Sequence, residues 1–253
     1  MKKKCLVYFV GAGPGDPDLI TVKGRKCIQD ADLVLYAGSL VPKEVVACAK
    51  EYAEVVDSSS MILDETHAMI LETVRSGGSV ARVHTGDPSL YGAVKEQMFL
   101  LDRDGVSYEV IPGVTAAFAA AAAARVSFTL AEKTQSLIFA RLEGRTAVPE
   151  KESLKELARS NSSMAIYLSS TNPEALEKEL MEGGYPEDTP VVIGYRIGLP
   201  DQRIITTCIS LLARDAKQAG INKQAVFLIL PGQQDDPIFS KLYSRDFSHG
   251  FRQ

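Results

Sequence analysis

The chain has 253 residues, and its hydrophobic content of 45% is enough for one large packed domain or two smaller ones. Its formal net charge of −4 argues against a nucleic-acid-binding surface, and no apolar run approaches the roughly 18 residues of a membrane span. The four cysteines lie far apart in sequence and the three histidines lack zinc-site spacing. We therefore expect reduced thiols, a cytoplasmic location and no metal site.

Apolar runs of strand length alternate with helical patterns along the chain. The predicted strands are 5–10, 33–36, 54–57, 79–83, 106–111, 135–140, 163–168, 191–196, 203–207 and 225–230. Apolar spacing and helix-breaking glycines predict helices between them, such as 62–76, 93–103, 150–159 and 209–219. Three lysines precede the first apolar run, but that run is short and ends in a glycine-proline loop, so we interpret it as a strand rather than a signal peptide.

This alternation predicts an α/β protein with mainly parallel sheets and helical crossovers. The turn Gly198–Asp201 predicts that 203–207 runs antiparallel to the strand before it. The pattern restarts near 128–134, so we expect two α/β domains, 1–128 and 129–253, with an active-site cleft between them.

The first strand leads into a glycine-rich loop, Gly11–Gly15, followed by residues that suit a helix start, with Asp16 as the cap. A dinucleotide fingerprint needs its third glycine one residue later. Pro14 removes an N–H donor, and Asp16 places negative charge where a phosphate would bind. No acid follows the second strand to bind a ribose, since Asp32 precedes it. A dinucleotide is therefore disfavoured, whereas a nucleoside ligand without phosphates and a purely structural turn stay open.

Other strand ends also have distinctive residues, namely Thr85–Gly92, Pro112–Thr115, Leu168–Ser170 and Tyr195–Arg196. They contain few catalytic groups, which suits a reaction that depends on positioning. Asp87 either accepts hydrogen bonds from a ligand or caps the following helix. His84 is the one weak candidate for an acid or base, and otherwise a polar residue at a strand end. The segment with Arg141, Glu143 and Arg145 is either a loop exposed to solvent or a site in which the arginines bind carboxylates through paired hydrogen bonds.

Three motifs, in this order and spacing, resemble those of the tetrapyrrole methylases: Val10–Thr21, His84–Pro88 with Tyr91-Gly92, and Pro112–Thr115. These are enzymes of corrin and sirohaem synthesis that use S-adenosylmethionine and release S-adenosylhomocysteine. The segments 141–150 and 247–252 resemble the branch that methylates carbon 11 of precorrin-4 or its cobalt form. The resemblance implies two α/β domains, a tetrapyrrole substrate and a homodimer, whereas the net charge and the lack of a long apolar run predict no nucleic-acid or membrane partner.

The resemblance also implies which residues form the site. The expected cofactor-binding residues are Pro14, Thr85, Gly86, Asp87, Leu90, Thr115, Ala116, Leu168, Tyr195 and Ala225. The expected substrate-binding residues are Arg141, Glu143 and Arg145. Thr85 stands where many relatives that methylate uroporphyrinogen have glycine, which agrees with the corrin branch. Leu142 replaces a smaller residue between Arg141 and Glu143.

Two alternatives stay open. One is another methyltransferase of the same fold, acting on another precorrin carbon, on uroporphyrinogen III or on a protein in the manner of diphthine enzymes. The other is a tetrapyrrole carrier without catalytic activity. Overall resemblance favours the cobalt form of the substrate, methylated on carbon 11 in cobalamin biosynthesis.

Overall fold

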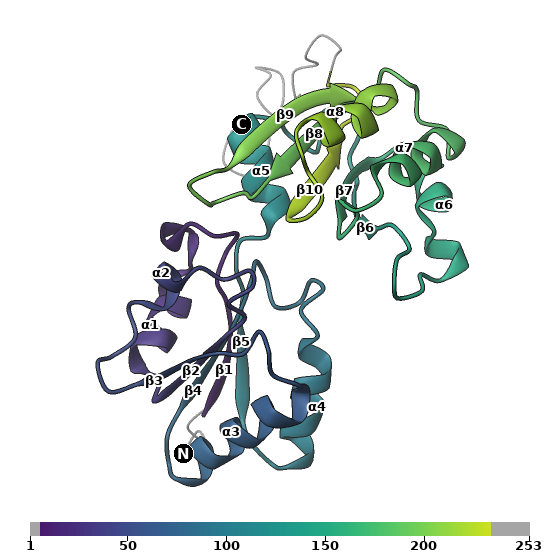
Figure 1. Ribbon diagram of the computed structural model, residues 1–253. Coiled ribbons are helices and arrows are strands. Elements are labelled where there is room, and N and C mark those ends of the chain that lie inside the picture. The colour runs from purple at the N-terminus through teal and green to yellow at the C-terminus, as the bar shows by residue number, and fades with distance from the viewer. Residues whose placement is uncertain (1–5, 234–253) are drawn as a thin grey trace, which may run out of the picture. The chain divides into compact units, whose positions relative to one another are not determined.

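The computed structural model describes residues 6–233, so Cys5 and the tail motif 247–252 lie outside the described residues. Contacts divide the chain into two compact units, Met1–Ala119 with Ile197–Pro200, and Ala120–Arg196 with Asp201–Gln253 (Figure 1). This boundary lies before residue 128, and the sequence-based division into folding domains stays a prediction. Each predicted strand overlaps an observed one.

The first unit contains a five-stranded sheet in the order β3-β2-β4-β1-β5. Its strands are β1 (Val7–Gly11), β2 (Leu33–Tyr36), β3 (Glu54–Asp57), β4 (Val80–His84) and β5 (Tyr108–Ile111). Every pairing in this sheet is parallel. The carboxyl ends of β4, β1 and β5 therefore lie next to one another at a single edge, with Gly11 opposite His84 and Val10 opposite Ile111.

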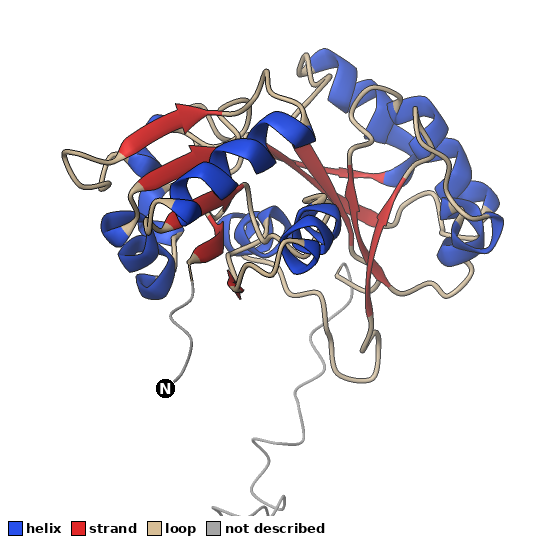
Figure 2. Cartoon of the chain, turned by 90° about the horizontal axis from the view of Figure 1, so that it is seen from below, coloured by secondary structure: helices blue, strands red, loops and turns tan. Residues whose placement is uncertain are grey.

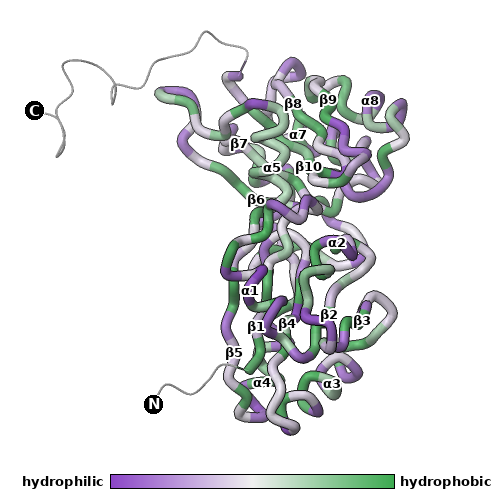
Figure 3. Tube along the Cα trace, turned by 90° about the vertical axis from the view of Figure 1, so that its left-hand side faces the viewer, coloured by the Kyte–Doolittle hydropathy of each residue, from purple (hydrophilic) through white to green (hydrophobic). Residues whose placement is uncertain are grey.

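Helices cover both faces of this sheet, as Figure 2 shows. They are α1 (Val22–Asp30), α2 (Lys43–Val46), α3 (Leu63–Arg75) and α4 (Val94–Arg103). Because side chains alternate along a strand, Val10 packs with α1 and α2, whereas Phe9 packs with α3 and α4. Both faces are therefore apolar, and the trace of this unit in Figure 3 includes green, hydrophobic stretches along its strands.

The first helix differs from the prediction. Asp16 does act as a cap, but its side chain accepts from the N–H of Asp18 and caps only the short 3₁₀ turn Pro17–Leu19. The chain is extended at Ile20, and α1 begins one turn later with Thr21 as its cap.

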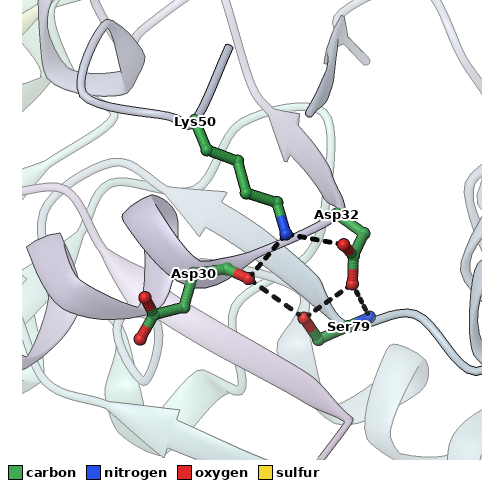
Figure 4. A network of polar contacts seen from close by, with 4 residues as sticks. All are labelled: Asp30, Asp32, Lys50 and Ser79. Atoms are coloured by element: carbon green, nitrogen blue, oxygen red, sulfur yellow. Dashed lines mark hydrogen bonds and ion pairs between the residues drawn. The ribbon is translucent and has the colours of Figure 1, made fainter. Parts of the chain in front are cut away.

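Asp32 lies at the amino end of β2, opposite to the edge that holds the glycine loop. Its carboxylate accepts from Lys50 Nζ at 2.6 Å and from the Ser79 N–H at 2.7 Å, and Lys50 also donates to the Asp30 carbonyl (Figure 4). The hydrogen bond from Lys50, followed by that from Ser79, lowers the pKa of Asp32. Asp32 thus joins α1, β4 and the segment after α2, which is a structural role.

The second unit contains a sheet in the order β6-β7-β10-β8-β9. Its strands are β6 (Leu137–Arg141), β7 (Ser163–Tyr167), β8 (Pro190–Tyr195), β9 (Arg203–Cys208) and β10 (Ala225–Ile229). Only β6 and β7 pair in parallel among the described strands of this sheet. The predicted α/β class is confirmed, and five of the eight pairings in the two described sheets are parallel. The second sheet by itself is mixed, because the predicted hairpin between β8 and β9 reverses the chain.

Among the described residues, three α-helices lie wholly in this unit, namely α6 (Leu154–Ala158), α7 (Pro173–Glu182) and α8 (Leu212–Gln218), and α5 (Ala116–Ala124) precedes them in the chain. The helix α5 spans the division between the two units. Leu154, Leu176 and Leu212 pack from α6, α7 and α8 into one core with Ile166 and Phe227 of the strands. Asn172 caps α7, as its position before Pro173 predicts. The helices and strands thus supply this core, and the loops at the strand ends are available to form a site.

Candidate active site

Three loops of the first unit meet where β4, β1 and β5 end. A Cβ atom on Gly113 would lie 2.1 Å from the carbonyl oxygen of Gly86, and one on Gly11 would lie 2.5 Å from the nitrogen of Gly113. The N–H groups of Gly13 and Gly86 donate to each other's carbonyls at 3.2 and 2.8 Å. Glycine is required here because the three backbones approach too closely for any side chain.

Asp87 connects two of these loops. Its Oδ2 accepts from the Gly113 N–H at 2.9 Å, and its Oδ1 accepts from the Ser89 N–H at 2.8 Å. The carboxylate does not cap α4, which begins later at Val94 without a side-chain cap. Each carboxylate oxygen retains further lone pairs, so Asp87 can hold the loops together and still accept a hydrogen bond from a ligand.

The loop after β4 has an unusual backbone. Gly86, Tyr91 and Ala93 all have positive φ values, of 61°, 54° and 48°. Such conformations cost free energy for residues other than glycine and gather at functional sites. The first unit brings together the predicted cofactor residues that lie in its loops and at the start of α5, namely Pro14, Thr85, Gly86, Asp87, Leu90, Thr115 and Ala116.

His84 is the last residue of β4 and is only 6% exposed. Its Nε2 has no hydrogen-bond partner among the described residues, and its ring lies 5.9 Å from that of Phe9. Burial, together with the charge of Arg82, lowers the pKa of His84 to about 3. A pKa this low makes the imidazole a weak base and leaves it without an ionised proton to donate near pH 7, which argues against the acid or base role considered for it.

Arg82 is a residue that the sequence did not single out. It is buried in β4, where Nη1 donates to Ser58 Oγ at 2.6 Å and Nε donates to Gln97 Oε1 at 3.1 Å. Gln97 in turn donates to the carbonyl of Ala93. Burial lowers the pKa of Arg82 to about 10. This chain of hydrogen bonds fixes the end of the loop after β4, and a charged residue inside an apolar strand was the available signal.

One edge of the second sheet collects the remaining predicted residues. Arg141 pairs with Tyr167 at the ends of β6 and β7, and Tyr195 at the end of β8 pairs with Ala225 at the start of β10. Leu168 follows Tyr167 with φ 54° and is 68% exposed. A strained, exposed leucine beside two strand ends is a candidate for ligand contact.

The loop after β6 differs from the expectation for Arg141. The Arg141 guanidinium donates to three carbonyls of its own loop, those of Leu142 at 3.3 Å, Thr146 at 3.0 Å and Ala147 at 2.7 Å. Glu143 and Arg145 are exposed and make no hydrogen bond or ion pair with another described residue. Of the three residues predicted to bind substrate, Arg141 thus has most of its donors engaged, and the other two are accessible.

Residues 6–233 include no group of three or more His, Cys, Asp or Glu side chains that could hold a metal ion. No helix in that range is long and apolar enough to cross a membrane. Lysine and arginine are absent from the loop segments 11–16, 85–92 and 112–116. These loops therefore offer backbone groups and a carboxylate, and suit a ligand without phosphates.

Comparison with known proteins gives matches over nearly the whole chain. The family model for tetrapyrrole (corrin/porphyrin) methylases matches residues 6–213. The cobalt-precorrin-4 C(11)-methyltransferase of Priestia megaterium is 48% identical over 251 residues, which cover 98% of this chain and 97% of that protein. The X-ray structure of a cobalt precorrin-4 methyltransferase of cobalamin biosynthesis is 49% identical with a TM-score of 0.87, and the match covers 88% of this chain and 94% of that one.

A more distant structure was solved with a ligand. It is the uroporphyrin-III C-methyltransferase of Thermus thermophilus complexed with S-adenosylhomocysteine, which is 26% identical with a TM-score of 0.74. The match covers 89% of this chain and 92% of that one.

Proposed function

This chain belongs to the tetrapyrrole methylase family, and on that premise we propose that it transfers a methyl group from S-adenosylmethionine to carbon 11 of cobalt-precorrin-4 in cobalamin biosynthesis. The observation that supports this most strongly is the 48% identity to a cobalt-precorrin-4 C(11)-methyltransferase across 98% of the chain. A uroporphyrinogen-III C-methyltransferase of Priestia megaterium is 33% identical over 233 residues, and the Thermus thermophilus enzyme is 26% identical, so that substrate is a weaker candidate.

S-adenosylmethionine fits the residues present. The glycine contacts bring backbone N–H and C=O groups of three loops together, and Asp87 adds a negative charge that suits an amine or a sulfonium. The bound cofactor would supply a methyl group already activated on a sulfonium. We assign its binding in the first unit to Pro14, Thr85, Gly86, Asp87, Leu90, Thr115 and Ala116, and in the second unit to Leu168, Tyr195 and Ala225.

The protein's own contribution is positioning. No acid or base is assigned, because burial and a lowered pKa make His84 a weak base, and because the nucleophile is a carbon of the substrate. The reacting atoms need to be held roughly 3–3.5 Å apart and in line, which the close-packed loops of the first unit favour by their rigidity. We assign recognition of the substrate's carboxylates to the loop after β6, with Arg145 as the accessible cation and Glu143 beside it.

The test is a reaction with methyl-labelled S-adenosylmethionine and cobalt-precorrin-4, followed by NMR of the labelled product. We expect the label on carbon 11. Parallel reactions contain metal-free precorrin-4 or uroporphyrinogen III in place of cobalt-precorrin-4. If either compound were methylated faster, it would be the preferred substrate and the assignment of cobalt-precorrin-4 would be wrong. Label on a different carbon, or transfer to no tetrapyrrole at all, would refute the proposal.

We also propose a homodimer that works in the cytoplasm, as the family resemblance implies. Light scattering on the purified protein would then give twice the mass of the chain, and fractionation of the producing cell would recover the protein with cytoplasmic markers. A monomeric mass or a membrane fraction would contradict these two assignments.

A further inference from the structure

The loop after β6 is anchored at its base by its own first residues. Leu142 is 6% exposed and packs in the core of the second unit. Its N–H donates to Ser169 Oγ at 2.9 Å, and Ser169 Oγ in turn donates to the carbonyl of Tyr167 at 2.7 Å. The position where the loop leaves β6 is therefore fixed against the end of β7.

The far side of the loop is held by Arg141. Its Nη1 donates to the Thr146 carbonyl at 3.0 Å, and its Nη2 donates to the Ala147 carbonyl at 2.7 Å. A planar guanidinium suits this arrangement because its N–H groups form a rigid fork that reaches two acceptors at once. The side chain thus closes the loop from 142 to 147 into a ring, with Glu143, Gly144 and Arg145 exposed at its tip.

We propose that Arg141 is a positioning residue for substrate recognition, and that it acts by holding Arg145 where a carboxylate of the tetrapyrrole meets it. The inference rests on the proposed function. It replaces the expectation that Arg141 and Arg145 bind carboxylates in the same way. Arg145 makes the contact. Because Arg141 already holds the loop in one conformation, the binding free energy is not reduced by the entropy lost when a flexible loop becomes ordered.

The first test measures the loop without any substrate. Trypsin cleaves after Arg145, and a protease requires a flexible stretch of chain around the bond that it cuts. We expect Arg141→Gln to raise the rate of cleavage at this bond at least about fivefold, measured by mass spectrometry. Arg141→Lys should raise it as well, because one ammonium group does not reproduce the fork across two carbonyls. Arg159→Gln is the matched control, since Arg159 is an exposed arginine of the same unit whose guanidinium pairs with Glu156.

The second test measures recognition. We expect Arg141→Gln to raise the KM for cobalt-precorrin-4 about tenfold, with kcat and the affinity for S-adenosylhomocysteine changed less than about twofold. If Arg141 acts through Arg145, the double variant Arg141→Gln/Arg145→Gln should have the KM of Arg145→Gln alone. Arg141→Lys should remain impaired, although it keeps the charge.

Each contrary result has a distinct meaning. Unchanged tryptic cleavage in Arg141→Gln would overturn the bracing of the loop. The positioning role would be overturned if the increases in KM of the two single variants multiplied in the double variant, or if Arg141→Lys had the KM of the parent. Either result would show that Arg141 binds the substrate itself. Faster cleavage in a protein that binds no tetrapyrrole would overturn the proposed function, and with it the role of Arg141 in recognition.

Discussion

The contact among the glycine loops makes a sharp prediction for Gly113→Ala. The added methyl carbon would lie 2.1 Å from the Gly86 carbonyl oxygen and 2.8 Å from the Gly11 Cα, and both of these neighbours are backbone atoms. No rotamer change can relieve such a contact. One loop therefore has to move by at least about 1.3 Å to reach 3.4 Å, where ordinary van der Waals contact begins. That movement also lengthens the hydrogen bond from the Gly113 N–H to Asp87 Oδ2, now 2.9 Å.

The expected cost follows from these two effects. Overpacking by a methyl group costs about 1–3 kcal/mol. A hydrogen bond to a carboxylate contributes about 1.5–3 kcal/mol, and weakening it loses part or all of that contribution. We therefore expect Gly113→Ala to lower the free energy of unfolding by roughly 2–5 kcal/mol, which corresponds to a fall in Tm of roughly 5–15 °C. Because the moved loop lies in the proposed cofactor site, the affinity for S-adenosylhomocysteine should fall at least about tenfold.

Urea unfolding and calorimetric titration with S-adenosylhomocysteine measure these two quantities. Gly144→Ala is the matched control, because a Cβ atom there would meet no atom within 4 Å and its φ is not positive. That variant should remain within about 0.5 kcal/mol of the parent. A Gly113→Ala protein with unchanged stability and unchanged affinity would refute the conclusion that these loops need glycine for their close approach.

Three further predictions concern titrating or hydrogen-bonding groups. Asp87→Asn keeps only one acceptor oxygen for the N–H groups of Gly113 and Ser89, so the affinity for S-adenosylhomocysteine should fall about tenfold by calorimetry. Equal affinity would leave Asp87 with only the structural role of holding the two loops together. The pKa of His84 is lowered to about 3, so its neutral form is favoured by folding and the protein loses stability as pH falls below about 6.5. Between pH 7.5 and 5 the parent should lose about 2 kcal/mol more than His84→Gln in urea unfolding, and parallel curves would contradict this. The pKa of Asp32 is also lowered, chiefly by the hydrogen bond from Lys50, so its ionised form is favoured by folding. In urea unfolding, the parent should therefore be more stable than Asp32→Asn by a constant amount above about pH 5, and this difference should shrink below about pH 4. A difference that stays constant down to lower pH would argue against the ion pair.

The sequence predicted the elements of this fold well because apolar periodicity is a local signal. The five strands of the first sheet, including the short β3, follow from runs such as Leu33–Tyr36. The start of α1 was misplaced, because Asp16 and Pro17 are equally good signals for a 3₁₀ turn as for an α-helix. Caps specify that a turn begins, whereas its length depends on how the next residues pack.

The arrangement of the candidate site could be predicted in part. The glycine loops have a residue-type signature, so Gly11, Gly86 and Gly113 could be placed together once β1, β4 and β5 were expected in one parallel sheet. The bracing by Arg141 has no such signature, because its acceptors are backbone carbonyls that any residue supplies. The burial of His84 could not be predicted from the sequence either. Every residue of β4 is buried, so the strand has no alternation of apolar and polar residues that would indicate which side chains face the core.

The direction of β10 explains how Ala225 comes to lie beside Tyr195, another residue proposed for the site. In a parallel sheet, ligands meet the carboxyl ends of strands, and a search for site residues looks there. The hairpin between β8 and β9 reverses the chain, and the crossover through α8 preserves the direction of β9 in β10. The strand β10 therefore enters between β7 and β8 antiparallel to both, and its amino end lies at their carboxyl ends. Ala225, the first residue of β10, consequently pairs with Tyr195, the last residue of β8, so a rule that reads only carboxyl ends would find Tyr195 and miss its neighbour.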